Sequence, residues 1–289
     1  MNIAIIGLGH AFEKQHNSLT QNKQIDVIEL CDVDPEKTKK YNCNNNYLSL
    51  QSKNVIVATP PHLHLEMVEN LLRLDKSIIL EKPIVTSLPE LAILKNISEN
   101  SPFYTSLHFS FGLEIDYFIN NINSIPNRIH CYISDNYVSY KKIKESALCL
   151  RGSYLDETIN PLSALGRMFG YNIKFISCKK KYYPGDIYDY YSFSSFIIEG
   201  IETNIEVIWN NEESQKYIDL YYDNFIIRLD SMNQAVINIT TNETLFSGFG
   251  DRMTNHYLGV YSDYINTKDN YYTSLKLHEE LLKGVDYEN

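Results

Sequence analysis

Short apolar, β-branched runs alternate with longer amphipathic stretches up to about residue 115, and this rhythm restricts the fold more than any other feature of the chain. Strands separated by helices at this spacing are typical of a parallel, doubly wound sheet. The expected strands are Asn2 to Ile6, Asp26 to Cys31, Asn54 to Ala58, Ser77 to Leu80 and Phe103 to Leu107, and the expected helices include His62 to Leu74 and Ser87 to Ile97.

Beyond about residue 125 the pattern changes to longer runs that alternate like antiparallel strands. We therefore expect an α/β protein of two domains: a dinucleotide-binding domain over residues 1–115, and over residues 116–289 an α+β domain with a large, mostly antiparallel open sheet. The runs are Asn127 to Ser134, Tyr190 to Ile198, Thr203 to Asn210 and Tyr217 to Leu229, interrupted by one helix near Asn160 to Phe169.

The first expected strand leads into a glycine turn, Gly7-Leu8-Gly9. The first glycine allows a tight turn, and the second lets backbone N–H groups and the next helix approach a pyrophosphate, as in Rossmann-type domains. Phe12 occupies the position of the third glycine of that fingerprint, although Ala11 offers a small side chain one position earlier. We expect a cofactor site here that is formed by Gly7, Gly9, His10 and Ala11.

An acidic residue stands where a dinucleotide-binding domain needs one. Asp32 ends the second expected strand, roughly 25 residues past Gly7, where a carboxylate can accept hydrogen bonds from an adenosine ribose. It also suits a turn or helix N-cap ahead of Pro35, and both roles can hold at once. Because a carboxylate would repel a 2′-phosphate, NAD is favoured as the cofactor over NADP.

Two further motifs are more specific. Thr59-Pro60-Pro61 follows the third expected strand, with His64 shortly after it, and Glu81-Lys82-Pro83 ends the fourth. A diproline turn with a nearby histidine, a helix, and a strand that ends in Glu-Lys-Pro together resemble the Gfo/Idh/MocA oxidoreductases, the family of glucose–fructose oxidoreductase and inositol dehydrogenase. The resemblance runs the whole length of the chain, from the glycine turn to a final helix.

The resemblance implies roles for these residues. Lys82 looks like the lysine that contacts both the nicotinamide ribose and the substrate, where it would hydrogen-bond the reacting oxygen and ease proton movement during hydride transfer. For His64, a helix-start histidine without a function is the alternative. Contacts on the cofactor side are implied for Thr59, Pro60, His64, Glu81 and Lys82.

The chain departs from the family in its second domain. The family typically has two glycines, a few residues, an aspartate and then a histidine four positions later. Here Asp156 matches the aspartate and, on a helix, shares a face with Asn160, which replaces the histidine. An amide can hydrogen-bond a substrate hydroxyl but cannot accept a proton near pH 7. The expected catalytic residues are therefore Lys82, Asp156 and Asn160.

Three interpretations of this replacement stay open. Lys82 serves as acid and base unaided, or another side chain relays the proton, or the chain binds cofactor and ligand without turnover. Carbonyl reduction, which needs only a proton donor, is favoured over alcohol oxidation, which needs a base. The candidates for a relay and for substrate contact are His108, Tyr154 and His256.

The composition argues against several other classes of protein. The formal net charge of −10 comes from 26 Lys and Arg against 36 Asp and Glu, so we expect no nucleic-acid partner. No window approaches the roughly 18 apolar residues that a membrane span needs, so we expect no membrane partner. The five cysteines are scattered without a C-x-x-C pair, which argues against a disulfide framework or a metal site and for a cytoplasmic protein.

Together these features predict an NAD(H)-dependent oxidoreductase acting on a CH–OH or carbonyl group of a sugar, a nucleotide-linked sugar or a related polyol. The alternatives are an imine or enone reductase of the same family, and a non-catalytic cofactor-binding sensor or scaffold, which the Phe12 and Asn160 departures favour. The expected partner is a small sugar-type substrate. The resemblance also implies a homodimer or homotetramer that forms through the C-terminal sheet.

Overall fold

In the computed structural model of the protein, residues 1–136, 150–182 and 188–287 are described, and the chain forms two compact units. Unit 1 comprises Met1–Leu107 and Met253–Leu275, and unit 2 comprises His108–Arg252 and Lys276–Asn289. The chain therefore returns to unit 1 after unit 2 has been largely built, and a single division point does not separate the two units.

Unit 1 contains a five-stranded parallel sheet of order β2-β1-β3-β4-β5, which confirms the doubly wound sheet. The three inner strands are buried almost throughout, as expected for a parallel sheet that helices cover on both faces. The strands are β1 (Asn2–Ile6), β2 (Asp26–Cys31), β3 (Asn54–Val57), β4 (Ser77–Glu81) and β5 (Tyr104–Ser106), all within one or two residues of the predicted bounds.

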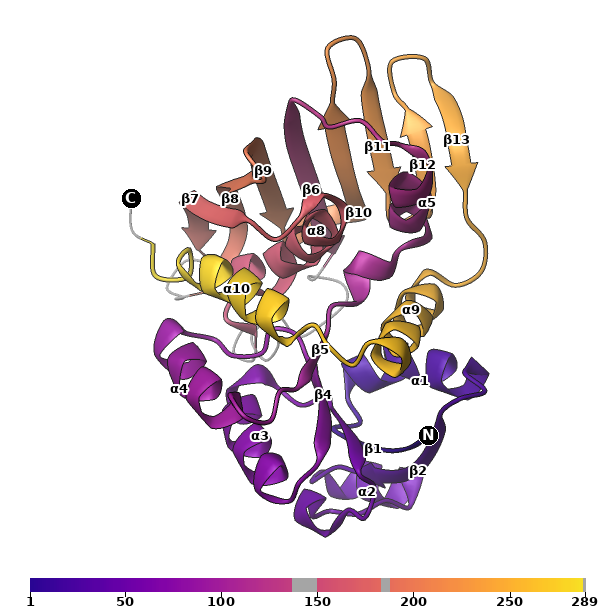
Figure 1. The fold of residues 1–289 in the computed structure, drawn as a ribbon, viewed down its shortest axis with the longest axis vertical. Helices are drawn as coiled ribbons and strands as arrows, with labels where there is room; N and C mark the ends of the chain where they lie inside the picture. Colours follow the sequence, from indigo (N-terminus) through magenta and orange to yellow (C-terminus); the bar gives the residue numbers. More distant parts are fainter. Residues whose placement is uncertain (137–149, 183–187, 288–289) are drawn as a thin grey trace. The chain divides into compact units, whose positions relative to one another are not determined.

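Helices lie on both faces of this sheet (Figure 1). On one face α3 packs against α4, and on the other α1 and α9 lie side by side, joined by a hydrogen bond of 3.0 Å from Ser18 Oγ to the Thr254 carbonyl. The helical elements are α1 (His10–Gln21), α2 (Pro35–Tyr41), η1 (Tyr47–Ser49), η2 (Pro61–Leu63), α3 (His64–Arg73), α4 (Leu88–Ser98) and α9 (Arg252–Asn266).

The start of α4 follows from its sequence. Ser87 Oγ accepts a hydrogen bond of 3.4 Å from the Glu90 N–H, which is half of a capping box. The Glu90 carboxylate reaches one residue further back and accepts a bond of 2.8 Å from the Thr86 N–H.

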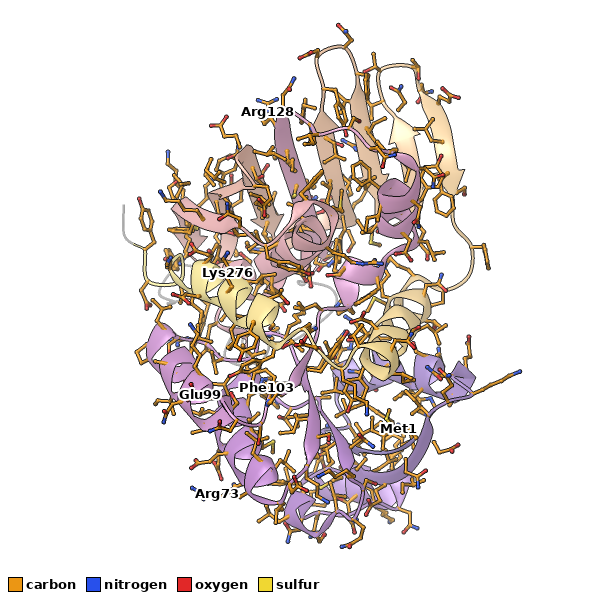
Figure 2. The ribbon with its side chains drawn as sticks, viewed as in Figure 1. Met1, Arg73, Glu99, Phe103, Arg128 and Lys276 are labelled. Carbon is orange, nitrogen blue, oxygen red and sulfur yellow. The ribbon has the colours of Figure 1, made fainter. Side chains whose placement is uncertain are left out.

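At the entrance to β5, the buried ring of Phe103, which is labelled in Figure 2, packs edge-to-face on Tyr271 of α10 (Tyr271–Leu282), with ring centroids 5.2 Å apart.

Unit 2 contains an eight-stranded sheet of order β13-β12-β11-β10-β6-β9-β8-β7, antiparallel except for the β6–β9 pair. This confirms the mostly antiparallel second sheet. The run from Tyr217 to Leu229 spans two of its strands, because the Tyr222 N–H donates to the Phe225 carbonyl at 3.0 Å and the chain reverses. The strands are β6 (Arg128–Asn136), β7 (Ile173–Tyr182), β8 (Asp189–Ile198), β9 (Ile201–Ile208), β10 (Asn210–Tyr221), β11 (Ile226–Asp230), β12 (Ala235–Asn238) and β13 (Glu243–Ser247).

Two helices, α5 (Leu113–Asn121) and α8 (Ser153–Phe169), pack on one face of this sheet, and the 3-10 turn η3 (His108–Phe111) packs along α8 (Figure 1). Burial along β8 and β9 alternates between buried and half-buried positions, so one face forms the core and the other is partly exposed. Arg128, at the start of β6, lies over the Tyr221 ring at 4.3 Å (Figure 2). None of the helices within the described residues is both long and apolar enough to cross a membrane.

Candidate active site

The glycine turn adopts a backbone that its residue types require. Gly7 has φ +91°, and a Cβ at this position would lie 2.6 Å from the Ala58 carbonyl oxygen. Only glycine meets both conditions. A Cβ at Gly9, the N-cap of α1, would meet nothing nearer than Lys37 Nζ at 4.0 Å, so the turn is open on that side. His10 and Ala11 form the half-buried first positions of α1.

Phe12 stands in place of the third glycine and is buried. Its ring packs edge-to-face on Tyr41 of α2 and on His16, with centroid distances of 5.5 and 5.4 Å. The Phe12 ring thus packs between α1 and α2 and does not enter the glycine turn. The Phe12 departure therefore leaves the backbone of the glycine turn open at Gly9.

Asp32 holds the glycine turn as well as the end of β2. Its Oδ2 accepts a hydrogen bond of 2.7 Å from the Leu8 N–H, its Oδ1 accepts one of 2.9 Å from the Asp34 N–H, and Lys37 Nζ lies 3.4 Å from Oδ2. Burial alone would raise the pKa of Asp32, but these hydrogen bonds and the Lys37 charge hold it below its usual value. The carboxylate is therefore ionised at neutral pH beside the glycine turn.

His64 joins the two loops that follow β3 and β4. Its Nε2 lies 2.9 Å from the Thr59 carbonyl oxygen, and its Nδ1 lies 3.1 Å from that of Pro83. The ring is fully buried, and burial lowers the pKa of His64 to about 4, although the carbonyls favour the charged form. Both ring nitrogens thus face backbone of this chain, so His64 positions the exposed Pro60 and half-buried Thr59 on one side and the Glu-Lys-Pro turn on the other.

The Glu-Lys-Pro turn (Glu81-Lys82-Pro83) has one buried and one accessible side chain. Glu81 is 4% exposed and accepts hydrogen bonds from Gln15 Nε2 at 2.7 Å and the Tyr257 hydroxyl at 3.1 Å. Burial raises the pKa of Glu81 against the opposing charge of Lys82. Lys82 is half-buried, at the carboxyl end of the parallel sheet. Glu81 therefore anchors the turn, and Lys82 is the member that can reach a ligand.

In unit 2, Asp156 and Asn160 lie one turn apart on α8, and both are about 5% exposed. Pro161, inside the helix, lacks the N–H that would bond the carbonyl of Glu157 and so breaks the helical hydrogen-bond pattern at this turn.

The helix begins at Ser153, earlier than predicted, because the buried Asp189 carboxylate accepts a hydrogen bond of 2.8 Å from the Tyr154 N–H.

A cluster of three charged side chains, Asp135, Glu157 and Lys216, adjoins Asn160 and is called the charge cluster below. Lys216 Nζ lies 2.8 Å from Asp135 Oδ2 and 3.1 Å from Glu157 Oε2, and Asn160 Nδ2 donates to the same Glu157 oxygen at 2.7 Å. Burial raises the pKa of Asp135 to about 6, with Lys216 opposing and Glu157 adding to the rise. Burial would lower the pKa of Lys216, but the two carboxylates raise it.

Sequence reasoning missed the charge cluster, although one signal for it exists. Lys216 alternates along β10 with the buried Ile218 and Leu220, so it is a lysine on the apolar face of an amphipathic strand. A charge in such a position requires a buried partner, and Glu157, the residue after Asp156, is one.

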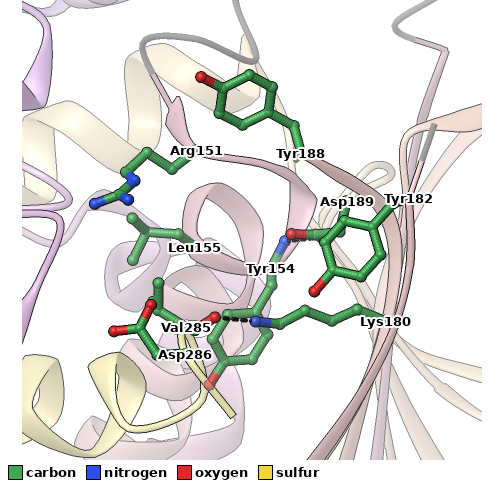
Figure 3. Close-up of a pocket in the computed structure, with 9 residues that line it drawn as sticks. All are labelled: Arg151, Tyr154, Leu155, Lys180, Tyr182, Tyr188, Asp189, Val285 and Asp286. Carbon is green, nitrogen blue, oxygen red and sulfur yellow. Dashed lines mark hydrogen bonds between the residues drawn. The ribbon is translucent and has the colours of Figure 1, made fainter. Parts of the chain in front are cut away.

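The candidate relay residues occupy different places. Tyr154 is buried and donates a hydrogen bond of 2.9 Å to the Leu281 carbonyl, and it lies on the side of α8 roughly opposite Asp156. It lines a cavity of about 210 Å³ together with Lys180, whose Nζ donates to the Val285 carbonyl (Figure 3). His108 begins η3 in unit 2, and His256 is fully buried on α9 in unit 1.

Comparisons with known proteins agree with this fold. Residues 1–102 match the family model described as "Oxidoreductase family, NAD-binding Rossmann fold" of the Gfo/Idh/MocA group. A glucose-6-phosphate 3-dehydrogenase from Bacillus subtilis (strain 168) is 23% identical over 252 residues, which cover 83% of this chain and 67% of that protein.

Solved structures share the fold at low identity. A 3-ketoreductase from Actinomadura kijaniata in complex with TDP-benzene and NADP has a TM-score of 0.78 at 12% identity, covering 98% of this chain and 96% of that one. A UDP-N-acetylglucosamine 3-dehydrogenase from Acidithiobacillus ferrooxidans has a TM-score of 0.77 at 12% identity with the same coverage. The family match and the glycine turn together show that residues 1–102 form a nicotinamide-cofactor-binding Rossmann fold of the Gfo/Idh/MocA oxidoreductase type.

Proposed function

We propose that the protein transfers a hydride between NAD(H) and a CH–OH or carbonyl carbon of a sugar, and that the sugar carries a phosphate or nucleotide group. One observation carries this proposal. The glycine turn, Asp32, Thr59 and Lys82 follow β1, β2, β3 and β4 in turn, so all four lie at the carboxyl edge of one parallel sheet. Ligands of doubly wound sheets bind at this edge.

The residues at this edge suit a dinucleotide. The open side of the glycine turn admits a pyrophosphate to the N-terminus of α1, and the ionised Asp32 can accept hydrogen bonds from a ribose. When bound, the nicotinamide supplies or accepts the hydride. Lys82 donates a proton to the carbonyl oxygen during reduction and takes it back during oxidation. Asp156 orients that oxygen, and Asn160 binds a neighbouring hydroxyl.

NAD is the proposed cofactor because the Asp32 carboxylate repels a 2′-phosphate. The opposing influence is Lys37, whose ammonium lies 3.4 Å from Asp32 and whose side chain is 36% exposed. Its charge lowers the cost of placing an anion near Asp32 but is already shared with the carboxylate. The preference for NAD therefore depends on Asp32 being ionised, which its two backbone hydrogen bonds favour.

The substrate class is inferred from relatives that are named for reactions at carbon 3 of glucose 6-phosphate and of a UDP-linked sugar. We place the reacting carbon at the same position of a hexose.

We also propose a homodimer through the partly exposed face of the second sheet. On that face Tyr132 stacks on Tyr217 at 5.3 Å, and Arg228 covers the Tyr217 ring at 3.6 Å. Tyrosine and arginine are the residue types enriched at protein interfaces.

A fluorescence titration with NADH and NADPH tests the proposed function. We expect the wild type to bind NADH more tightly than NADPH, and Asp32→Ala to weaken NADH binding by about tenfold or more through the loss of the ribose acceptor. Asp26→Ala is the matched control, because it removes an exposed carboxylate from the other end of the same strand. If the wild type binds neither coenzyme, this proposal is wrong; if it binds a coenzyme but turns over no sugar, the non-catalytic cofactor-binding alternative replaces it.

A further inference from the structure

Lys216 points into the core of unit 2. It lies on the same face of β10 as Ile218 and Leu220, and it pairs across the sheet with Ile133 of β6. Asp135 stands two residues beyond Ile133, on the same face of β6, and Glu157 approaches from α8. A buried ammonium between two carboxylates holds both of them in fixed positions.

Glu157 in turn restricts the side chain of Asn160. The carboxylate oxygen that binds Lys216 at 3.1 Å is the same atom that accepts the Asn160 Nδ2–H at 2.7 Å. Because Oε2 of Glu157 is the acceptor for the Lys216 ammonium, it can also accept from the amide nitrogen, whereas an amide oxygen turned towards it would face a second acceptor. The reversed orientation of Asn160 would bring its Oδ1 against this carboxylate.

We propose that Glu157, held by Lys216, is a positioning residue that fixes the amide of Asn160 with its oxygen turned away from the charge cluster, ready to accept a hydrogen bond from a substrate hydroxyl. This inference rests on the proposed function. It narrows the substrate class to sugars with a hydroxyl next to the reacting carbon. With an amide at position 160, the site selects a substrate hydroxyl but does not exchange a proton with it. Proton transfer therefore falls to Lys82.

The charge cluster offers a matched pair of variants. Glu157→Gln and Asp135→Asn each replace one carboxylate beside Lys216 with an amide of the same shape. Only the first change touches Asn160, because the glutamine can both accept and donate and so accommodates either orientation of the amide. The two variants therefore separate the orientation of Asn160 from the general effect of removing a buried charge.

The first measurement follows the Asn160 side-chain amide by 15N–1H NMR, with its signals assigned by their loss in Asn160→Asp. We expect Glu157→Gln to shift these signals and Asp135→Asn to leave them near their wild-type positions. Unchanged signals in Glu157→Gln, or equal shifts in both variants, would overturn the positioning role. This measurement needs neither cofactor nor substrate, so its outcome is separate from the test of the proposed function.

The second measurement compares kcat/KM for glucose 6-phosphate with kcat/KM for its 2-deoxy and 4-deoxy analogues. We expect the wild type and Asp135→Asn to prefer the full sugar over one analogue by about tenfold or more, and Glu157→Gln to lose most of that preference. An equal preference in all three proteins would overturn the selection of a hydroxyl. Binding of NADH without turnover of any of these sugars would overturn the hydroxyl-binding role for a hexose phosphate and would leave the cofactor part of the proposed function standing.

Discussion

The Tyr257 hydroxyl donates a hydrogen bond of 3.1 Å to Glu81, a residue 176 positions earlier in the chain. The same carboxylate oxygen accepts a bond of 2.7 Å from Gln15, whose own amide oxygen accepts one of 2.5 Å from Tyr261. Side chains of α1 and α9 thus converge on the end of β4. The Glu-Lys-Pro turn, and with it Lys82, is held from the buried side by these contacts.

We expect Tyr257→Phe to lower the free energy of unfolding by about 1 kcal/mol, because Glu81 loses one donor while the ring is kept. Urea denaturation measures the change. The control is Tyr272→Phe, which makes the same substitution at a side chain that is 72% exposed and should be neutral. Equal effects of the two substitutions would show that the Glu81 contact contributes nothing to stability.

Lys82→Ala should reduce turnover by about 100-fold or more because the proton donor is removed, while NADH still binds through the glycine turn and Asp32. Lys82→Arg should be nearly as slow, because a guanidinium keeps the charge but does not release its proton. The assay is NADH oxidation with a 3-keto sugar, alongside a fluorescence titration. Lys39→Ala, at an exposed position of α2, is the control. Wild-type turnover in Lys82→Ala would remove this residue from the mechanism.

The lowered pKa of His64 makes the free energy of unfolding fall as the pH falls. Its pKa is about 4 in the folded chain and about 6.5 in an unfolded one, so the unfolded state takes up the proton first as the pH falls. The stabilisation is complete above about pH 6.5 and is lost as the pH falls towards 4, with about 2 kcal/mol gone at pH 5.

The measurement is the difference in free energy of unfolding between wild type and His64→Gln, taken at pH 8 and pH 5. The difference should shrink by about 2 kcal/mol at the lower pH. Comparing the two proteins cancels the titration of groups that they share, including Asp135, whose raised pKa acts in the opposite sense. His16→Gln, at an exposed position of α1, serves as the control. A difference that does not change with pH would mean that His64 is not held neutral.

Lys216→Met should lower the free energy of unfolding by about 3–5 kcal/mol, because the buried Glu157 and the half-buried Asp135 lose their shared cation. Lys283→Met is the comparison, since Lys283 pairs with Glu280 on the surface, where its side chain is 42% exposed. An exposed pair contributes less than about 1 kcal/mol. Chemical denaturation of both variants measures the gap, and similar losses would show that the charge cluster adds no stability of its own.

Much of unit 1 could be predicted from sequence because its signals are local. The strand bounds follow from buried β-branched runs, and the glycine turn follows from a backbone that only Gly7 can adopt. The start of α4 is written in Ser87 and Glu90. Each of these features depends on residues a few positions apart, so a single stretch of chain contains the whole signal.

The sequence by itself thus determined the two kinds of sheet, the resemblance to the family over the first domain, and the position of the glycine turn, Asp32 and Lys82 after their strands. The tertiary structure alone decided that α9 returns to unit 1, that Glu81 is an anchor, and that Asn160 binds Glu157, which Lys216 also binds. The physical reason is the range of the interactions. Lys216 and Glu157 lie 59 residues apart and Tyr257 and Glu81 lie 176 apart, and no local propensity encodes such pairs. Only folding excludes the water that would otherwise solvate these charges, and burial is what obliges each of them to find its partner.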